Sequence, residues 1–152
     1  MNFDDLKLIL LPTDFSESSE GALRAAIQLA QTFHAAIEVF HVDIDPALVL
    51  PPPLDTVSVS FLFERVLAGT AERLEQIVAE VRKAGVSCSS AEELGRSYNA
   101  IVERARLAGA GMIVMGSHGR SALGHALLGS VAEKVVEHAP CAVLVVPIAP
   151  HP

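Results

Sequence analysis

Hydrophobic runs alternate with amphipathic stretches from one end of the chain to the other. The runs are short and rich in Leu, Ile and Val, which favours buried strands, whereas the amphipathic stretches repeat their apolar residues every three or four positions, which favours helices. The predicted strands are 7–11, 36–42, 86–94, 111–115 and 141–147, of which the third has the weakest pattern. The predicted helices are 17–33, 61–83, 98–108 and 130–137.

Strands that read as near-continuous apolar runs are typical of a parallel sheet with both faces covered. Five such strands alternating with four helices predict an α/β fold, a single doubly wound, Rossmann-like domain spanning residues 1–152. One connection breaks this rhythm. Residues 43–60 form a long, Pro-containing segment that is also rich in Leu and Val. Two interpretations stay open for it, a lid or partner surface and a variable excursion packed on its own domain.

The composition limits the partners that we expect. Half of the residues are hydrophobic, and no apolar stretch approaches the roughly 18 residues of a membrane span. The formal net charge is −7 and the 11 basic residues are scattered, which argues against a nucleic-acid partner. The acidic start of the chain lacks the pattern of a signal peptide, so we expect a cytoplasmic protein with no membrane partner. Isolated Cys88 and Cys141 are interpreted as two buried thiols, with a disulfide or redox site as the alternative.

A glycine-rich loop follows the predicted strand 111–115 and leads directly into the predicted helix that starts at Ser130. Its glycines have the pattern Gly116-x2-Gly119-x9-Gly129, followed by Ser130. Glycine lets a ligand approach the backbone closely, and the N–H groups at a helix N-terminus favour anions. The loop therefore predicts a phosphate site, with His118 and Arg120 as further candidate phosphate contacts.

A second polar segment follows the first predicted strand. In open parallel sheets, ligands bind beyond the carboxyl ends of the strands where the winding reverses, so this segment and the glycine loop are expected at one crevice. Thr13, Asp14 and Ser16 would offer polar contacts to a nucleotide, and Val42 an apolar wall for a base. The alternative is structural: Asp14 and Ser130 each have capping-box spacing to a glutamate three residues later.

Several motifs of known chemistry are incomplete in this chain. The stretch 124–130 resembles a P-loop, but Ser130 stands where the phosphate-binding Lys belongs. No G-x-G-x-x-G follows the first strand, and no G-x-S-x-G nucleophile elbow is present. The six histidines fall in no pattern that suggests a protein metal site, and His41, within a strand, is more typical of a hydrogen-bonded core residue.

These motifs together resemble the universal stress protein family, in its ATP-binding branch. The agreement covers nearly the whole chain, including the opening LLPTDFS at 10–16, the strand end at 41–43 and the segment 129–141. The resemblance implies a five-stranded parallel sheet in the order 3-2-1-4-5 and a site for ATP, with Mg²⁺ or Mn²⁺ carried by the phosphates. The implied ATP contacts are Pro12, Thr13, Asp14, Val42, Met115, Gly116, His118, Gly119, Arg120, Gly129, Ser130 and Val131. It also implies a homodimer joined through the last strand, for which Ala142–Val146 is an uncharged candidate edge.

Three functions are compatible with these residues. The first is a nucleotide-dependent regulatory module of the stress response, in which ATP orders the glycine loop and alters a surface read by an unknown protein partner. The second is slow ATP hydrolysis or phosphate transfer at the same crevice, with Asp14 and His118 as the candidate groups and no evident general base. The third is a dimeric interaction protein that needs no nucleotide.

Overall fold

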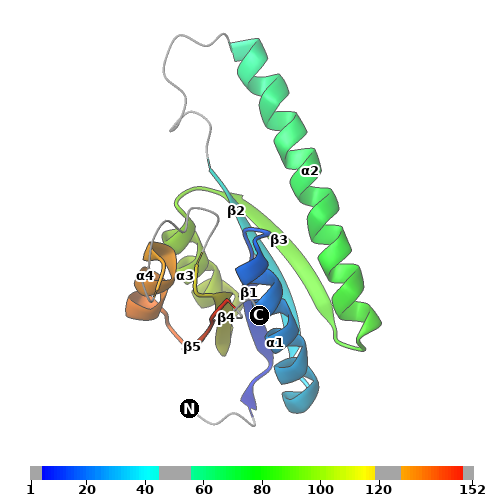
Figure 1. Ribbon diagram of the computed structural model, residues 1–152, viewed down its shortest axis with the longest axis vertical. Helices are drawn as coiled ribbons and strands as arrows, with labels where there is room; N and C mark the ends of the chain where they lie inside the picture. The colour runs from blue at the N-terminus through cyan, green and yellow to red at the C-terminus, as the bar shows by residue number, and fades with distance from the viewer. Residues whose placement is uncertain (1–4, 45–55, 119–127, 149–152) are drawn as a thin grey trace.

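Strands and helices alternate along the chain as the hydrophobic pattern predicts (Figure 1). The computed structural model describes residues 5–44, 56–118 and 128–148. The strands are β1 (Leu8–Pro12), β2 (Ala36–Asp43), β3 (Cys88–Leu94), β4 (Met112–Gly116) and β5 (Ala142–Val146). The helices are α1 (Glu17–Phe33), α2 (Thr56–Lys83), α3 (Ser97–Ala108) and α4 (Ser130–His138). No helix in these ranges is both long and apolar enough to cross a membrane.

The five strands form one parallel sheet in the order β3-β2-β1-β4-β5, which confirms the expected order and fold class. The chain winds outward from β1 to β3 and then returns to place β4 on the other side of β1. Leu10 pairs with Glu38 of β2 on one side and with Ile113 of β4 on the other. The carboxyl ends of β1 and β4 are therefore neighbours at the reversal point, where α/β sheets bind ligands.

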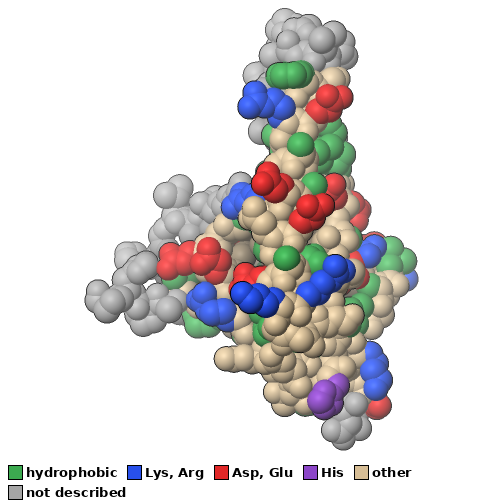
Figure 2. Space-filling view, turned by 90° about the vertical axis from the view of Figure 1, so that its right-hand side faces the viewer, with side chains coloured by type: hydrophobic (Ala, Val, Ile, Leu, Met, Phe, Trp, Pro, Cys, Tyr) green, Lys and Arg blue, Asp and Glu red, His purple; other side chains and the backbone are tan. Residues whose placement is uncertain are grey.

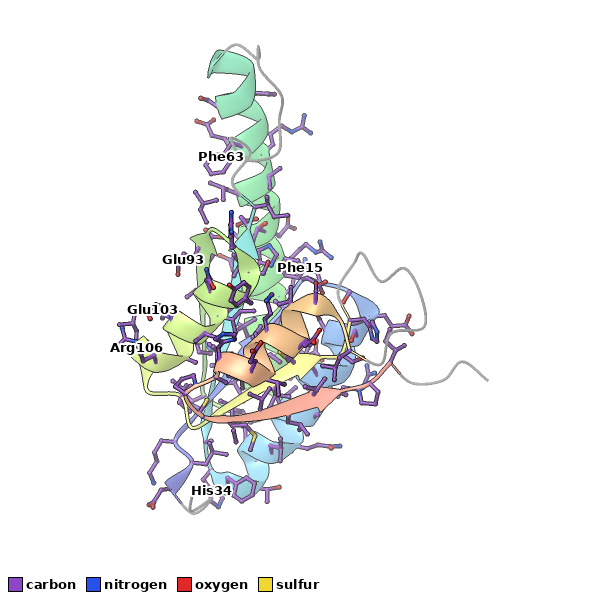
Figure 3. All side chains as sticks on the ribbon, turned by 90° about the vertical axis from the view of Figure 1, so that its left-hand side faces the viewer. Phe15, His34, Phe63, Glu93, Glu103 and Arg106 are labelled. Carbon is purple, nitrogen blue, oxygen red and sulfur yellow. The ribbon has the colours of Figure 1, made fainter. Side chains whose placement is uncertain are left out.

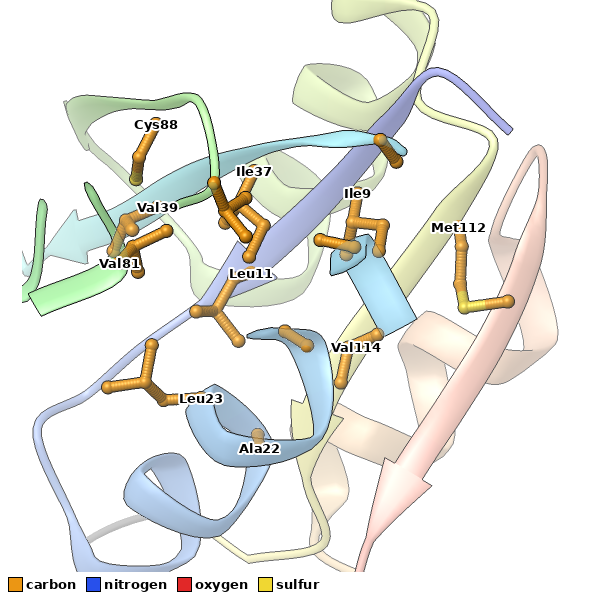
Figure 4. Close-up of a cluster of buried hydrophobic side chains, with 14 of the residues drawn as sticks. Ile9, Leu11, Ala22, Leu23, Ile37, Val39, Val81, Cys88, Met112 and Val114 are labelled. Atoms are coloured by element: carbon orange, nitrogen blue, oxygen red, sulfur yellow. The ribbon is translucent and has the colours of Figure 1, made fainter. Parts of the chain in front are cut away.

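Each face of the sheet packs against two helices. On one face, Ile9, Leu11 and Val114 pack with residues of α1 and α2 (Figure 4). On the other face, Leu10 and Ile113 pack with residues of α3 and α4. Consecutive residues of a strand point to opposite faces, so near-continuous apolar strands supply both cores at once.

The two edge strands of the sheet, β3 and β5, are less buried than the strands between them. β3 is an edge strand in which only Cys88 is buried, so its sequence needs little hydrophobic character. β5 is the opposite edge, and Leu144 at its centre is 39% exposed. Both cysteines are free thiols, and Cys88 is buried as expected, whereas Cys141 is only partly buried.

Helix α2 is longer than its sequence pattern predicts. It begins at Thr56 rather than at residue 61, so the connection from β2 is shorter than the predicted 43–60. Among the side chains that the structure describes, those of the apolar stripe are buried in the second half of the helix, where Leu74, Val78 and Val81 meet the sheet. Val66 is 56% exposed because the first half projects beyond the body of the domain, with charged and apolar side chains mixed on its surface (Figure 2).

Candidate functional site

The segment after β1 is tied to β2 by backbone and side-chain hydrogen bonds. The Thr13 amide donates to the carbonyl of Phe40 at 2.9 Å, which extends the β1–β2 ladder by one residue. The Thr13 carbonyl faces the Nδ1 atom of the buried His41 at 2.7 Å. His41 is thus a hydrogen-bonded core residue, as the sequence suggests, and it fixes the residue from which the predicted nucleotide loop begins.

Asp14 organises a tight turn ahead of α1. Its Oδ1 accepts from the Ser16 amide at 3.0 Å and from the Ser19 hydroxyl at 2.6 Å. The interpretation of Asp14 as the N-cap is wrong, because Ser16 is the N-cap and its side chain accepts from the Ser19 amide. Phe15 between them has φ 62°, a left-handed conformation that is uncommon for a bulky residue and is associated with functional sites.

The carboxyl end of β4 lies very close to the first turn of α1. A Cβ built on Gly116 would lie 2.2 Å from Ser18 Oγ and 2.8 Å from the Ser18 carbonyl carbon. Gly116 is therefore required for packing between β4 and α1, whether or not a ligand is present. The His118 amide also lies 3.4 Å from Ser18 Oγ, and Ser117 Oγ lies 2.9 Å from His118 Nδ1.

The two described ends of the glycine loop are joined to each other. The Gly129 amide donates to the Ser117 carbonyl at 2.7 Å, and the Ser117 amide donates to Val146 of β5 at 2.9 Å. The interpretation of Ser130 as an N-cap is wrong, because Gly129 occupies that position and makes no side-chain bond there. Ser130 is instead the exposed first residue of α4, in the helix turn whose N-terminal amides favour an anion.

The apolar members of the predicted site share one face of the sheet. Val42, Met115 and Val131 all belong to the core that α3 and α4 cover. They come from β2, β4 and α4, and Pro12 ends β1 between the first two strands. The structure thus brings ten of the twelve predicted residues to the carboxyl edge of the sheet, while Gly119 and Arg120 lie outside the described residues.

A groove of about 330 Å³ opens on the opposite side of the same edge, between α1 and α2. Leu11, Leu23 and Ile77 line its apolar part, and Thr13 and Ser16 its end nearest the predicted site. Phe15 also lines the groove, and Figure 3 shows it at the end of the molecule from which α2 projects. No group of three or more His, Cys, Asp or Glu side chains able to hold a metal ion occurs in the described ranges.

Sequence reasoning did not identify the serines that hold the site together. Ser18 and Ser117 are buried, with 2% and 4% of their surfaces exposed, and Ser19 bonds to Asp14. The available signal was the cluster of serines at positions 16, 18 and 19, because a small side chain at the start of α1 is what permits its contact with Gly116.

Comparison with known proteins agrees with this arrangement. Residues 6–147 match the universal stress protein family. Universal stress protein MJ0531 of Methanocaldococcus jannaschii is 36% identical over 141 residues, which cover 92% of this chain and 81% of that protein.

Solved structures share the fold. MJ0577 of Methanocaldococcus jannaschii superposes with a TM-score of 0.84 at 29% identity, over 96% of this chain and 99% of that chain. The universal stress protein of Archaeoglobus fulgidus in complex with dAMP has a TM-score of 0.65 at 21% identity, over 93% of this chain and 97% of that one. The match over nearly all of the sequence, together with the sheet order, shows that the chain belongs to the universal stress protein family.

Proposed function

We propose that the protein binds ATP at the carboxyl edge of β1, β2 and β4 and acts as a nucleotide-dependent regulatory module of the stress response. One observation carries the proposal. The reversal of the sheet places the Thr13–Ser16 turn beside the point where β4 ends and α4 begins. A polar turn and a helix N-terminus at neighbouring strand ends offer one end of the site to a nucleoside and the other to its phosphates.

The nucleoside end would be formed by the α3 and α4 side of the sheet. Val42 and Val131 offer apolar surface to a base, and the Asp14 carboxylate is an acceptor suited to a ribose hydroxyl or an adenine amino group. The dAMP complex of the Archaeoglobus fulgidus relative supports an adenine nucleotide as the ligand class.

The phosphate end would be formed by the start of α4. The Ser130 hydroxyl and the first amides of the helix are donors, and the helix dipole favours negative charge there. Gly119 and Arg120 would complete this end from the loop. Mg²⁺ or Mn²⁺ would be held mainly by the phosphates, since their oxygens are the ligands that such ions prefer.

The first test is to identify the nucleotide that the protein carries. The purified chain is denatured, and the released small molecules are separated by chromatography. Recovery of ATP near one molecule per chain supports the proposal. A protein that releases nothing and shows no binding of ATP with Mg²⁺ by calorimetry contradicts it.

A matched pair of variants tests the assignment of the site. Asp14→Asn keeps a carbonyl oxygen to accept from Ser16 and Ser19 but removes the charge and one acceptor, so ATP affinity should fall by about tenfold while the fold persists. Glu137→Gln makes the same kind of change on the exposed end of α4 and should leave the affinity unchanged. Equal affinities for both variants would exclude Asp14 from the site.

We also propose that two copies pair through β5. The strand pairs only with β4 among the described strands, and Leu144 is 39% exposed on it. An uncharged edge strand of this kind is otherwise open to aggregation.

A further inference from the structure

The buried pair of His41 and Asp43 lies beneath the predicted nucleotide turn. His41 is 8% exposed and Asp43 6%, and both lie at the carboxyl end of β2. The Nε2 atom of His41 is 3.3 Å from Oδ1 of Asp43, while its Nδ1 atom is 2.7 Å from the Thr13 carbonyl oxygen. Both ring nitrogens of His41 therefore face oxygen acceptors.

This arrangement limits the hydrogen bonds that the His41 ring can make. A carbonyl and a carboxylate oxygen can only accept hydrogen bonds, so each ring nitrogen must donate to its partner. A neutral imidazole has one N–H and would turn the lone pair of its other nitrogen toward an acceptor. Only the imidazolium donates on both sides, so the geometry favours the doubly protonated ring.

The surroundings of Asp43 favour the same state. Its Oδ1 accepts from the hydroxyl of Thr70 on α2 at 3.3 Å, and its Oδ2 is buried with no hydrogen-bond partner among the described residues. A carboxylate so poorly solvated is costly unless a cation lies beside it, and the His41 ring is 3.3 Å away.

Other charges near His41 have mixed signs. Glu92 occupies the paired position on β3, and Asp14 follows Thr13 in the turn. The Arg73 guanidinium of α2 lies 4.2 Å from the Phe15 ring centroid, and that ring lies 4.6 Å from the His41 ring. The Phe15 ring therefore contacts both the Arg73 guanidinium and the His41 ring, and an aromatic face stabilises a cation beside it.

We propose that His41 is a positioning residue for nucleotide binding: as an imidazolium it joins the Thr13 carbonyl to the Asp43 carboxylate and fixes the turn at Thr13–Asp14, so nucleotide affinity falls when the ring loses a proton. This inference rests on the function proposed above. The Thr13 amide remains bonded to Phe40 in either state, so loss of the proton loosens the turn without unfolding it. The expected effect is that of one hydrogen bond, about a fivefold loss of affinity.

The first experiment reads the protonation of His41 directly, without nucleotide. Ring ¹⁵N chemical shifts of the full chain are recorded from about pH 5 to about pH 8, the range in which imidazoles titrate. We expect two protonated nitrogens at the acid end, and Thr13 and Asp14 amide shifts that follow the loss of one proton. A ring with a single proton on Nδ1 throughout, with unmoved amides, overturns the proposal.

The second experiment measures ATP affinity by calorimetry over the same pH range for the wild type and His41→Gln. Titration of ATP and of other histidines acts on both proteins and cancels in the ratio of their affinities. The ratio should be about fivefold in favour of the wild type at the acid end and should approach one at the basic end. A constant ratio means a purely structural role and overturns the proposal.

A matched control and a separate readout keep the two proposals apart. His34→Gln makes the same change at the C-cap of α1, at the opposite end of the helix, and its ratio to the wild type should stay at one. If no protein binds ATP at any pH, the proposed function fails, while the ring shifts and the Thr13 amide still decide whether His41 holds the turn.

Discussion

Replacing Gly116 with alanine tests whether this glycine is needed for packing, independently of any ligand. The added Cβ would lie 2.2 Å from Ser18 Oγ and 2.8 Å from the Ser18 carbonyl carbon. The hydroxyl can rotate, but the carbonyl carbon belongs to the backbone of α1. Restoring an ordinary carbon–carbon contact of about 3.5 Å requires a backbone shift of about 0.7 Å between β4 and α1.

The magnitude follows from the cost of overpacking a close-packed site. Forced shifts of this kind destabilise proteins by about 1–3 kcal/mol, so we expect Gly116→Ala to lower the free energy of unfolding by about 2 kcal/mol. For a chain of this length the melting temperature should fall by about 4–8 °C. Urea denaturation of the nucleotide-free protein provides the free energy, and calorimetry provides the melting temperature.

The control is the same substitution at a glycine with open space around it. Gly69 lies in α2 with nothing within 4 Å of its built Cβ, so Gly69→Ala should raise the stability by about 0.5–1 kcal/mol through helix propensity. Adding Ser18→Ala to Gly116→Ala should recover part of the loss, because it removes the 2.2 Å contact. If Gly116→Ala were as stable as the wild type, the packing argument would be refuted.

Three further predictions concern other parts of the fold. Arg104 donates to the carboxylate of Glu38, whose side chain is 7% exposed. Arg104→Leu should therefore lower the free energy of unfolding, measured in urea, by about 2 kcal/mol, because it leaves a buried charge unpaired. Adding Glu38→Gln should recover most of this loss, and no recovery would contradict the pairing. Burial raises the pKa of Cys88 to about 11. Its alkylation by iodoacetamide at pH 8, followed by mass spectrometry, should therefore be about a hundredfold slower than in the unfolded chain. The rate of alkylation should increase as the pH rises toward this pKa. Leu144→Lys should convert a dimer paired through β5 into monomers on size-exclusion chromatography with light scattering, and an unchanged dimer would place the interface elsewhere.

The fold could be predicted from the sequence because the apolar pattern of each strand indicates which of its faces are buried. Leu8–Pro12 and Met112–Gly116 are apolar on both faces, which requires a sheet covered on both sides. The start of α2 at Thr56 was not predicted, because apolar residues in the first half of the helix, such as Phe61 and Val66, are exposed and their positions follow no burial pattern. The spacing of apolar residues indicates which face of a helix is buried, so it does not locate the end of a helix that is exposed to solvent.

The candidate site was predictable in its residues but not in their roles. The glycine pattern located the end of β4, yet Gly116 is needed for contact with Ser18, a residue 98 positions away in sequence and visible only in the fold. Capping-box spacing suggested Asp14 and Ser130 as caps, whereas the caps are Ser16 and Gly129. Spacing alone cannot decide such cases, because a cap depends on backbone dihedrals that several nearby residues are able to adopt.

The division of α2 into a supported and a projecting half has a consequence for how this chain can evolve. A helix of 28 residues is about 42 Å long, and the buried residues among its described side chains begin at Thr70. Substitutions at exposed positions before that point, such as Phe61 and Val66, change a surface without opening a cavity in either core. Selection for folding therefore constrains the second half of α2 strongly and the first half weakly, so new recognition properties can accumulate in the first half while the sheet and its carboxyl edge remain the same.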